Sequence, residues 1–187
     1  ALPARHGLYH VADEREAPVQ RAALARTIAA ALPGFDRATY PDWDALLARW
    51  WDSAPPGAAL VLDEFPSLAA SAPELPSLLQ KYVDRQTGPH LLLCGSSQRM
   101  MRGLVLDRSA PLYGRAGEVL RVGPLPAGWI REALPLRSDV EAVESYAVWG
   151  GVPRYWELAA ESPGRREAIR HLLLDPLRER SIEGGEL

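Results

Sequence analysis

The chain has 187 residues, of which 47% are hydrophobic and 24% charged, and its formal net charge at pH 7 is -3. This composition excludes a disordered or fibrous chain, and the negative net charge excludes the overall basic surface of many nucleic-acid-binding domains. The single cysteine, Cys94, excludes an internal disulfide, as is usual in a reducing compartment. No apolar run approaches the roughly 20 residues that cross a bilayer. We therefore expect a soluble, cytoplasmic protein with no membrane partner.

The spacing of apolar residues predicts the elements in the first two thirds of the chain. Apolar residues at helical spacing predict helices, and short apolar or alternating runs between turn residues predict strands. Helices that alternate with strands are typical of a parallel sheet, so the predicted fold class is α/β. In chain order we expect a strand over 7–12, helices over 18–32 and 43–51, a strand over 58–62, a helix over 75–85, a strand over 90–94, a helix over 100–106 and a strand over 118–122.

Beyond Pro126 the strand patterns cease and the helical patterns continue. They predict helices over 129–134, 138–149 and 164–174. We therefore expect two domains, which are an α/β core over residues 1–125 and a small helical, lid-like subdomain over residues 126–187.

Two adjacent acids, Asp63 and Glu64, follow the predicted strand over 58–62. Open α/β sheets bind ligands at the carboxyl ends of their strands, where these carboxylates would emerge. One carboxylate there can hold a magnesium ion through its water shell, and the other can accept a proton from an attacking water. An apolar strand that ends in Asp-Glu is the Walker B pattern. The alternative is that the two acids begin the next loop as a solvated helix cap.

Two serines, Ser96 and Ser97, follow the strand predicted over 90–94 and would lie at the same edge of the sheet. A hydroxyl at that edge can bond a γ-phosphate or position the attacking water. The alternative is a cap on the helix predicted over 100–106, and one serine can serve each purpose.

Five short motifs occur in order along the chain. They are Leu62 to Leu68, Leu75 to Gln80, Leu93 to Ser97 with Met100 and Met101, Pro111 to Arg115, and Gly150 to Tyr155. Together they resemble the archaeal-type ATPase family, which lies near the AAA+ and STAND groups of P-loop ATPases. The resemblance extends over residues 8–174 and rests on the order and spacing of all five motifs.

The resemblance implies a role for each matching residue. Asp63 would orient magnesium and Glu64 would activate water, while Ser96 or Ser97 would be the sensor of the γ-phosphate. Arg115 would be an arginine finger that stabilises charge in the transition state. The alternative for Arg115 is a surface salt bridge or a helix C-cap.

Gly151 and Pro153 match the Gly-x-Pro motif of the helical subdomain in the STAND group. The resemblance places that motif on the adenine side of the nucleotide, and it implies ATP and Mg2+ as cofactors. The alternative needs no ligand, because Gly-Gly-x-Pro suits a tight turn between two helices.

The chain departs from the family pattern at the phosphate-binding loop. No Gly-x-x-x-x-Gly-Lys-Ser/Thr sequence is present, and the single lysine, Lys81, lies in a predicted amphipathic helix. We expect the chain to begin after that loop and to end before the family's C-terminal regions. Contact with nucleic acid would be made only through those regions. By itself the chain is then expected to bind ATP weakly and to hydrolyse little of it.

The absent loop has a consequence for the sheet. In an AAA+-like order, the strand before the loop lies between the strands predicted over 90–94 and 118–122. Those strands would then close up on each other, or a neighbouring chain would cover the exposed edges, so self-association through sheet edges is a hypothesis. Two functions stay open: an ATP-hydrolysing module, and a nucleotide-independent interaction or regulatory scaffold derived from a P-loop ATPase. Glu64 and Arg115 favour the first, because a scaffold needs neither.

Overall fold

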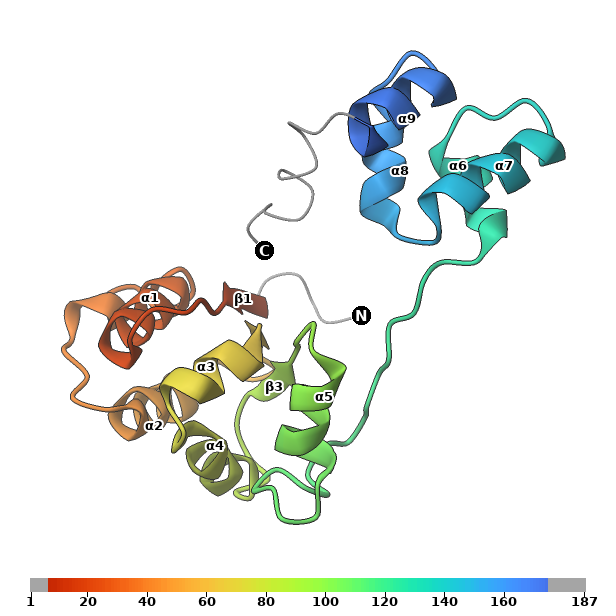
Figure 1. The fold of residues 1–187 in the computed structure, drawn as a ribbon. Coiled ribbons are helices and arrows are strands. Elements are labelled where there is room, and N and C mark those ends of the chain that lie inside the picture. Colours follow the sequence, from red (N-terminus) through yellow and green to blue (C-terminus); the bar gives the residue numbers. More distant parts are fainter. Residues whose placement is uncertain (1–6, 175–187) are drawn as a thin grey trace. The chain divides into compact units, whose positions relative to one another are not determined.

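The computed structural model describes residues 7–174, which divide into two compact units at the step from Val119 to Leu120 (Figure 1). Each unit has its own core of buried hydrophobic side chains. Among the described residues, no helix is both long and apolar enough to cross a membrane.

Unit 1 is built on a sheet of three parallel strands in the order β1-β2-β3. The register pairs Val11 with Asp63 and Leu62 with Leu93, so the carboxyl ends of the strands meet at one edge. The predicted α/β class with a parallel sheet is therefore confirmed. The strands are β1 (Gly7–Val11), β2 (Ala59–Asp63) and β3 (His90–Leu93).

Helices connect the strands of unit 1. Asp42 begins α2 by accepting a hydrogen bond from the Ala45 N–H at 2.8 Å, as an N-cap residue should. The helix predicted over 100–106 starts earlier and changes to a π-helical turn. The helices are α1 (Ala17–Ala29), η1 (Phe35–Arg37), α2 (Trp43–Ser53), α3 (Phe65–Ser71), α4 (Leu75–Val83), α5 (Gln98–Met101) and η2 (Arg102–Leu106).

One face of the sheet carries the core of unit 1. Leu60 and Leu62 from β2 belong to one buried cluster with Leu24 from α1, Trp50 from α2 and Phe65 from α3. These five side chains are 0% or 1% exposed. Because burial of this much apolar surface dominates folding stability, this face positions β2 firmly within the unit.

The opposite face of the sheet is open within the described residues. Side chains alternate between the two faces along a strand, and Tyr9, Val11 and Leu92 are 59%, 41% and 38% exposed. Parallel sheets are usually covered on both faces. Unit 1 therefore presents an apolar sheet face that its own described residues do not bury.

The prediction of a strand over 118–122 is wrong. This segment has no regular secondary structure, and its apolar residues Val119, Leu120 and Val122 are 58%, 77% and 92% exposed. Within residues 7–174, β3 is hydrogen-bonded to β2 alone, so the segment has no partner strand. An alternating pattern predicts which side chains would share a face, but a strand also needs a neighbour for its backbone N–H and C=O groups.

Two helices lie where the sequence predicts none, α3 and α8 (Pro153–Ala160). Each has a proline in its first turn, Pro66 and Pro153. Proline is favourable there because its fixed φ suits a helix start and its missing N–H would have no partner anyway. Both helices are short, so in the sequence each proline indicates a turn.

Unit 2 is a small bundle of helices with its own core. Ser138 begins α7 by accepting a hydrogen bond from the Glu141 N–H at 3.2 Å. Ile130, Trp156 and Ala168 come from three different helices and are at most 2% exposed. The helices are η3 (Ala127–Trp129), α6 (Ile130–Ala133), α7 (Asp139–Trp149), α8 and α9 (Arg165–Leu173).

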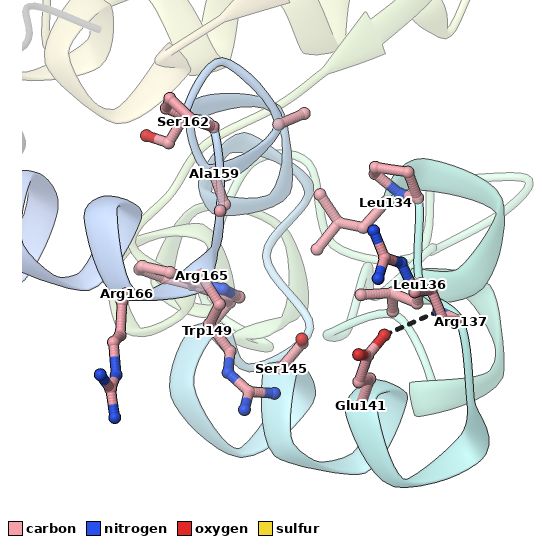
Figure 2. A pocket seen from close by; sticks show the side chains of 14 residues that line it. Leu134, Leu136, Arg137, Glu141, Ser145, Trp149, Ala159, Ser162, Arg165 and Arg166 are labelled. Atoms are coloured by element: carbon pink, nitrogen blue, oxygen red, sulfur yellow. Dashed lines mark hydrogen bonds between the residues drawn. The ribbon is translucent and has the colours of Figure 1, made fainter.

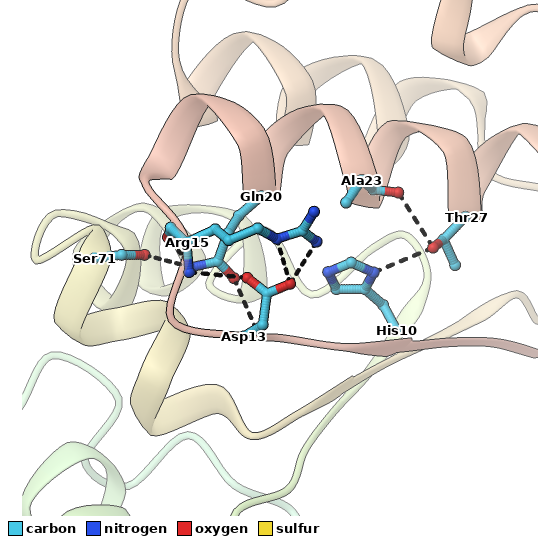
Figure 3. Close-up of polar contacts among 7 residues, drawn as sticks. All are labelled: His10, Asp13, Arg15, Gln20, Ala23, Thr27 and Ser71. Atoms are coloured by element: carbon cyan, nitrogen blue, oxygen red, sulfur yellow. Dashed lines mark hydrogen bonds and ion pairs between the residues drawn. The ribbon is translucent and has the colours of Figure 1, made fainter. Parts of the chain in front are cut away.

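A polar network joins α1 and α3 near the carboxyl end of β1 (Figure 3). Gln20 is 1% exposed and donates to the Arg15 carbonyl at 2.9 Å and to the Ser71 hydroxyl at 2.8 Å. Its side-chain oxygen accepts from the Asp13 N–H at 3.3 Å. A buried amide is tolerated only when it is hydrogen-bonded. Gln20 therefore ties the loop after β1 to the end of α3.

His10 on β1 is a second buried polar residue, close to this network but not bonded to it (Figure 3). Its exposure is 6%, its Nδ1 lies 3.1 Å from the Thr27 hydroxyl, and its Nε2 is buried without a hydrogen-bond partner. Burial lowers the pKa of His10 because the charged ring would lose its water; nearby Asp13 opposes this effect and Arg15 adds to it.

Unit 1 is expected to lose stability as the pH falls below about 6.5, where the unfolded chain binds a proton at His10 that the folded chain does not. The loss should continue until the pH reaches the lowered pKa of the folded state. Urea midpoints, followed by the amide signals of β1 between about pH 7.5 and about pH 5.5, should fall more in the wild type than in His10→Gln. The exposed His90 supplies the control, since His90→Gln should keep the wild-type dependence. Equal dependence in the wild type and His10→Gln would remove His10 as the cause.

Candidate active site

Backbone hydrogen bonds join β2 and β3 beyond their last regular residues. The Cys94 N–H donates to the Leu62 carbonyl at 2.9 Å, and the Phe65 N–H donates to the Cys94 carbonyl at 2.9 Å. These bonds hold Asp63 and Glu64 beside the segment that follows β3.

Glu64 has an unusual backbone conformation. Its φ and ψ are 49° and 40°, in the left-handed region that residues with a side chain rarely adopt. Glu64 occupies the N-cap position of α3, but its side chain does not cap that helix. Strain of this kind persists only where the surroundings hold it, and it gathers at functional sites. The turn directs the Glu64 carboxylate away from α3.

The Glu64 carboxylate instead reaches the segment after β3. Its Oε1 accepts a hydrogen bond from the Ser96 N–H at 3.2 Å. The structure thus brings the acid after β2 and the serine after β3 together at the carboxyl edge of the sheet. The solvated helix cap that was the alternative for Glu64 is absent, because its side chain makes no capping bond.

Asp63 is half-buried and has two partners. Its Oδ1 accepts from the Glu64 N–H at 2.9 Å, and its Oδ2 accepts from the hydroxyl of Tyr9 on β1. This bond to the carboxylate raises the pKa of Tyr9. Tyr9 is not among the site residues predicted from the sequence. The signal for it is the strand register, which places Tyr9 on the same sheet face as Asp63.

The two serines differ in their surroundings. Ser97 is the N-cap of α5, with its hydroxyl 3.4 Å from the Met100 N–H. This is the helix cap given above as the alternative to a sensor role. Ser96 is exposed and contributes its backbone N–H to Glu64. The hydroxyl of Ser96 is therefore the one that faces solvent at this edge.

Gly95 permits the close approach of the elements around the site. A Cβ atom at this position would lie 2.7 Å from Cδ of Pro66 and 2.9 Å from Sδ of Met101. Both distances are too short for a side chain. Glycine at residue 95 thus allows the start of α3 and the end of α5 to pack against the end of β3.

The structure does not bring Arg115 to this group. The Arg115 guanidinium pairs with both oxygens of Asp84, at 2.7 Å and 2.9 Å, and donates to the carbonyls of Pro111 and Tyr113. Asp84 is the C-cap residue of α4, which leads into the start of β3. Arg115 is thus held near the amino end of β3, whereas Glu64 and Ser96 lie at its carboxyl end.

Gly151 and Pro153 organise the turn between α7 and α8. A Cβ atom on Gly151 would lie 2.3 Å from the Leu125 carbonyl oxygen and 2.7 Å from Cβ of Pro124. The Leu125 N–H donates to the Gly151 carbonyl at 2.8 Å, and Pro153 occupies the first turn of α8. This geometry matches the tight turn that needs no ligand.

Gly151→Ala is expected to destabilise unit 2 by about 1–3 kcal/mol, because the new methyl group meets a backbone carbonyl that cannot move aside alone. Gly123→Ala is the matched control, since a Cβ atom there has no neighbour within 4 Å. Urea unfolding followed by the amide signals of α8 measures the effect. Identical midpoints for the two variants would show that Gly151 is not needed for packing.

The residues present fit magnesium and the attacking water better than they fit the triphosphate. Asp63 and Glu64 suit a Mg2+ ion that keeps several waters. In the part of the chain that the structure describes, no group of three or more His, Cys, Asp or Glu side chains could enclose a metal. Lys81, the single lysine, bonds both carboxylate oxygens of Asp44 at 2.8 Å and 2.9 Å and so does not serve as a phosphate ligand at this edge.

Comparison with known proteins supports the fold. The structure resembles the Walker-type ATPase PABY2304 of Pyrococcus abyssi with a TM-score of 0.67 and 16% identity, over 96% of this chain and 65% of that chain. Over 119 residues the chain is 36% identical to the uncharacterized protein MJECL04 of Methanocaldococcus jannaschii, a match that covers 62% of this chain and 26% of that protein. No family model matches. The chain thus has a Walker-type ATPase fold and spans less than two thirds of the length of both proteins.

Proposed function

We propose that this chain is the ATP-binding and ATP-hydrolysing module of an AAA+- or STAND-like ATPase, with an α/β core over residues 1–125 and a lid-like subdomain over residues 126–187. The observation that carries the proposal is the Glu64 carboxylate, which a left-handed backbone turn places beside the Ser96 N–H at the carboxyl edge of a parallel sheet. Ligands of open α/β sheets bind at this edge.

Each residue at the edge has a role in the proposal. When bound, Mg2+ would neutralise charge that develops on the phosphates. Asp63 would orient that ion through its water shell, and Glu64 would accept a proton from the attacking water. Ser96, whose hydroxyl faces solvent, is the better candidate for the γ-phosphate sensor, whereas Ser97 caps α5.

Three further residues would contact the nucleotide away from Asp63 and Glu64. They are Arg115, Gly151 and Pro153. Arg115 lies near the amino end of β3, away from Glu64 and Ser96. It would therefore act as an arginine finger either on a nucleotide bound by another chain or after it leaves Asp84. Gly151 and Pro153 would contact the adenine side of the nucleotide through the turn whose shape they set.

The affinity of the chain for ATP tests how much of the site these residues supply. We expect a Kd in the millimolar range, which corresponds to about -4 kcal/mol, because no phosphate-cradling Gly-rich loop occurs in the sequence. Isothermal titration with Mg2+ and ATP measures it. A Kd in the low micromolar range would contradict this expectation.

The alternative function is a nucleotide-independent interaction or regulatory scaffold. The ion pair between Arg115 and Asp84 favours it, because a surface salt bridge accounts for that arginine without any nucleotide. The contact of the Glu64 carboxylate with the Ser96 N–H favours the ATPase, because it lies at the edge of the sheet where ligands of open α/β sheets bind. Amide shifts caused by Mg2+ and ATP separate the two, as a scaffold should show none at Glu64 and Ser96.

We propose that the chain associates with a second copy of itself. The open sheet face with Tyr9, Val11 and Leu92, together with the outer edge of β3, would be covered by a second copy of the chain. Light scattering over a concentration series should show dimers, and Leu92→Lys should shift the population to monomers. A monomer at all concentrations would remove self-association from the account.

A further inference from the structure

Unit 2 contains a cavity of about 330 Å³ that lies between α7 and the segments on either side of it (Figure 2). Cavities of this size take small organic molecules. Its floor is apolar, because Leu134, Trp149 and Ala159 line it and are only 7%, 4% and 8% exposed. Figure 2 shows Leu134 on one side and Ala159 on the other. The lining does not include Gly151 or Pro153.

A buried hydroxyl points into this cavity. Ser145 on α7 is 1% exposed, and Figure 2 shows its oxygen directed into the space with no hydrogen bond to the other residues drawn. Ser145 therefore offers a hydrogen bond to a group inside the cavity.

The amino end of α9 lies at the same cavity. Gly164 is its N-cap residue and has no side chain to accept the N–H groups of the first turn. Arg165 and Arg166 add positive charge at the helix end where negative charge is normally stabilising. Glu144 pairs with Arg165 at 2.5 Å, and Glu167 adds one acid in the first turn. The N–H groups in the first turn of α9 therefore have no side-chain cap and can donate hydrogen bonds to an anion.

The charged residues that line the cavity also favour an anionic ligand. Arg137, Arg165 and Arg166 line the cavity together with a single acid, Glu141. One carboxylate oxygen of Glu141 already accepts the Arg137 N–H at 2.7 Å (Figure 2). The cavity thus combines an apolar floor with a surplus of hydrogen-bond donors and positive charge, which is the chemistry that recognises a phosphate on an apolar body.

We propose that this cavity binds a small, soluble organic phosphate monoester. Its phosphate lies at the start of α9 and accepts hydrogen bonds from the first-turn N–H groups, Ser145 and Arg137. Its apolar group lies on Trp149 and Leu134. This site belongs to unit 2 and shares no residue with the proposed ATPase site.

Phenyl phosphate is the probe for this site, and the amide shifts of the full chain are the readout. We expect shifts at Ser145 and Gly164, and about tenfold weaker binding in Arg137→Gln, because a charge-assisted hydrogen bond is lost. Arg154→Gln is the matched control, since Arg154 is exposed on α8 and does not line the cavity. This variant should bind like the wild type.

Two further ligands complete the experiment. Inorganic phosphate should bind more weakly than phenyl phosphate, and phenol should cause no shift at Gly164. The proposal is overturned if phenyl phosphate shifts no amide of the cavity, if Arg137→Gln binds as the wild type does, or if phenol binds equally well. Arg137 is exposed, so its replacement leaves the fold intact, and a thermal melt of each variant verifies this.

Discussion

In a protein that supplies the phosphate-binding loop absent from these residues, replacement of Glu64 by glutamine is expected to lower the rate of ATP hydrolysis by a factor of about 10²–10⁴, the contribution of a positioned general base. Glutamine keeps the size of the side chain and an oxygen that can accept the Ser96 N–H, so the backbone turn and the affinity for ATP should change little. Phosphate release at millimolar ATP and Mg2+ measures the rate, and titration of the same variant measures the affinity.

Glu74→Gln is the matched control for this prediction. Glu74 is exposed at the start of α4, and its side chain makes no capping bond. Its replacement should leave the rate of hydrolysis unchanged. A Glu64→Gln chain that hydrolyses ATP at the wild-type rate would exclude Glu64 from the chemistry, whatever its position beside Ser96.

Trp50→Ala is expected to destabilise unit 1 by about 3–5 kcal/mol, the usual cost of removing a large aromatic side chain from a core. Trp50 is 0% exposed on α2, and its indole N–H has no hydrogen-bond partner. The loss therefore comes from packing and from the cavity left behind. This loss is a large share of the free energy of unfolding of a typical domain, which is roughly 5–15 kcal/mol.

Urea unfolding followed by the amide signals of β2 measures this loss. Tyr113→Ala is the control, because Tyr113 belongs to the same unit but is 43% exposed, and its replacement should change the free energy of unfolding by less than about 0.5 kcal/mol. A Trp50→Ala midpoint equal to that of Tyr113→Ala would mean that α2 does not carry the core of unit 1.

The sequence predicts much of this fold because buried parallel strands are short continuous apolar runs. The runs over 58–62 and 90–94 are such strands, and their parallel order puts the residues that follow them at one edge. The contact between Glu64 and Ser96 agrees with that expectation. Helices with a clear apolar stripe, such as α2, are likewise evident from the sequence.

The partners of Arg115 and Tyr9 could not be predicted from local patterns. The ion pair of Arg115 joins residues 31 positions apart, and the Tyr9 bond to Asp63 spans 54 positions. The segment over 118–122 shows the converse error, since its pattern is that of a strand but no neighbouring strand pairs with it. Local pattern predicts which side chains share a face, whereas the contacts made by that face depend on the rest of the chain.

Amide shifts caused by Mg2+ and ATP test the central claim most directly, because they report even millimolar binding residue by residue. The account predicts shifts at Glu64, Gly95 and Ser96, at the carboxyl ends of β2 and β3, and none at Asp84 near the amino end of β3. Shifts confined to residues elsewhere in the chain, with Glu64 and Ser96 unchanged at saturating ATP, would contradict it.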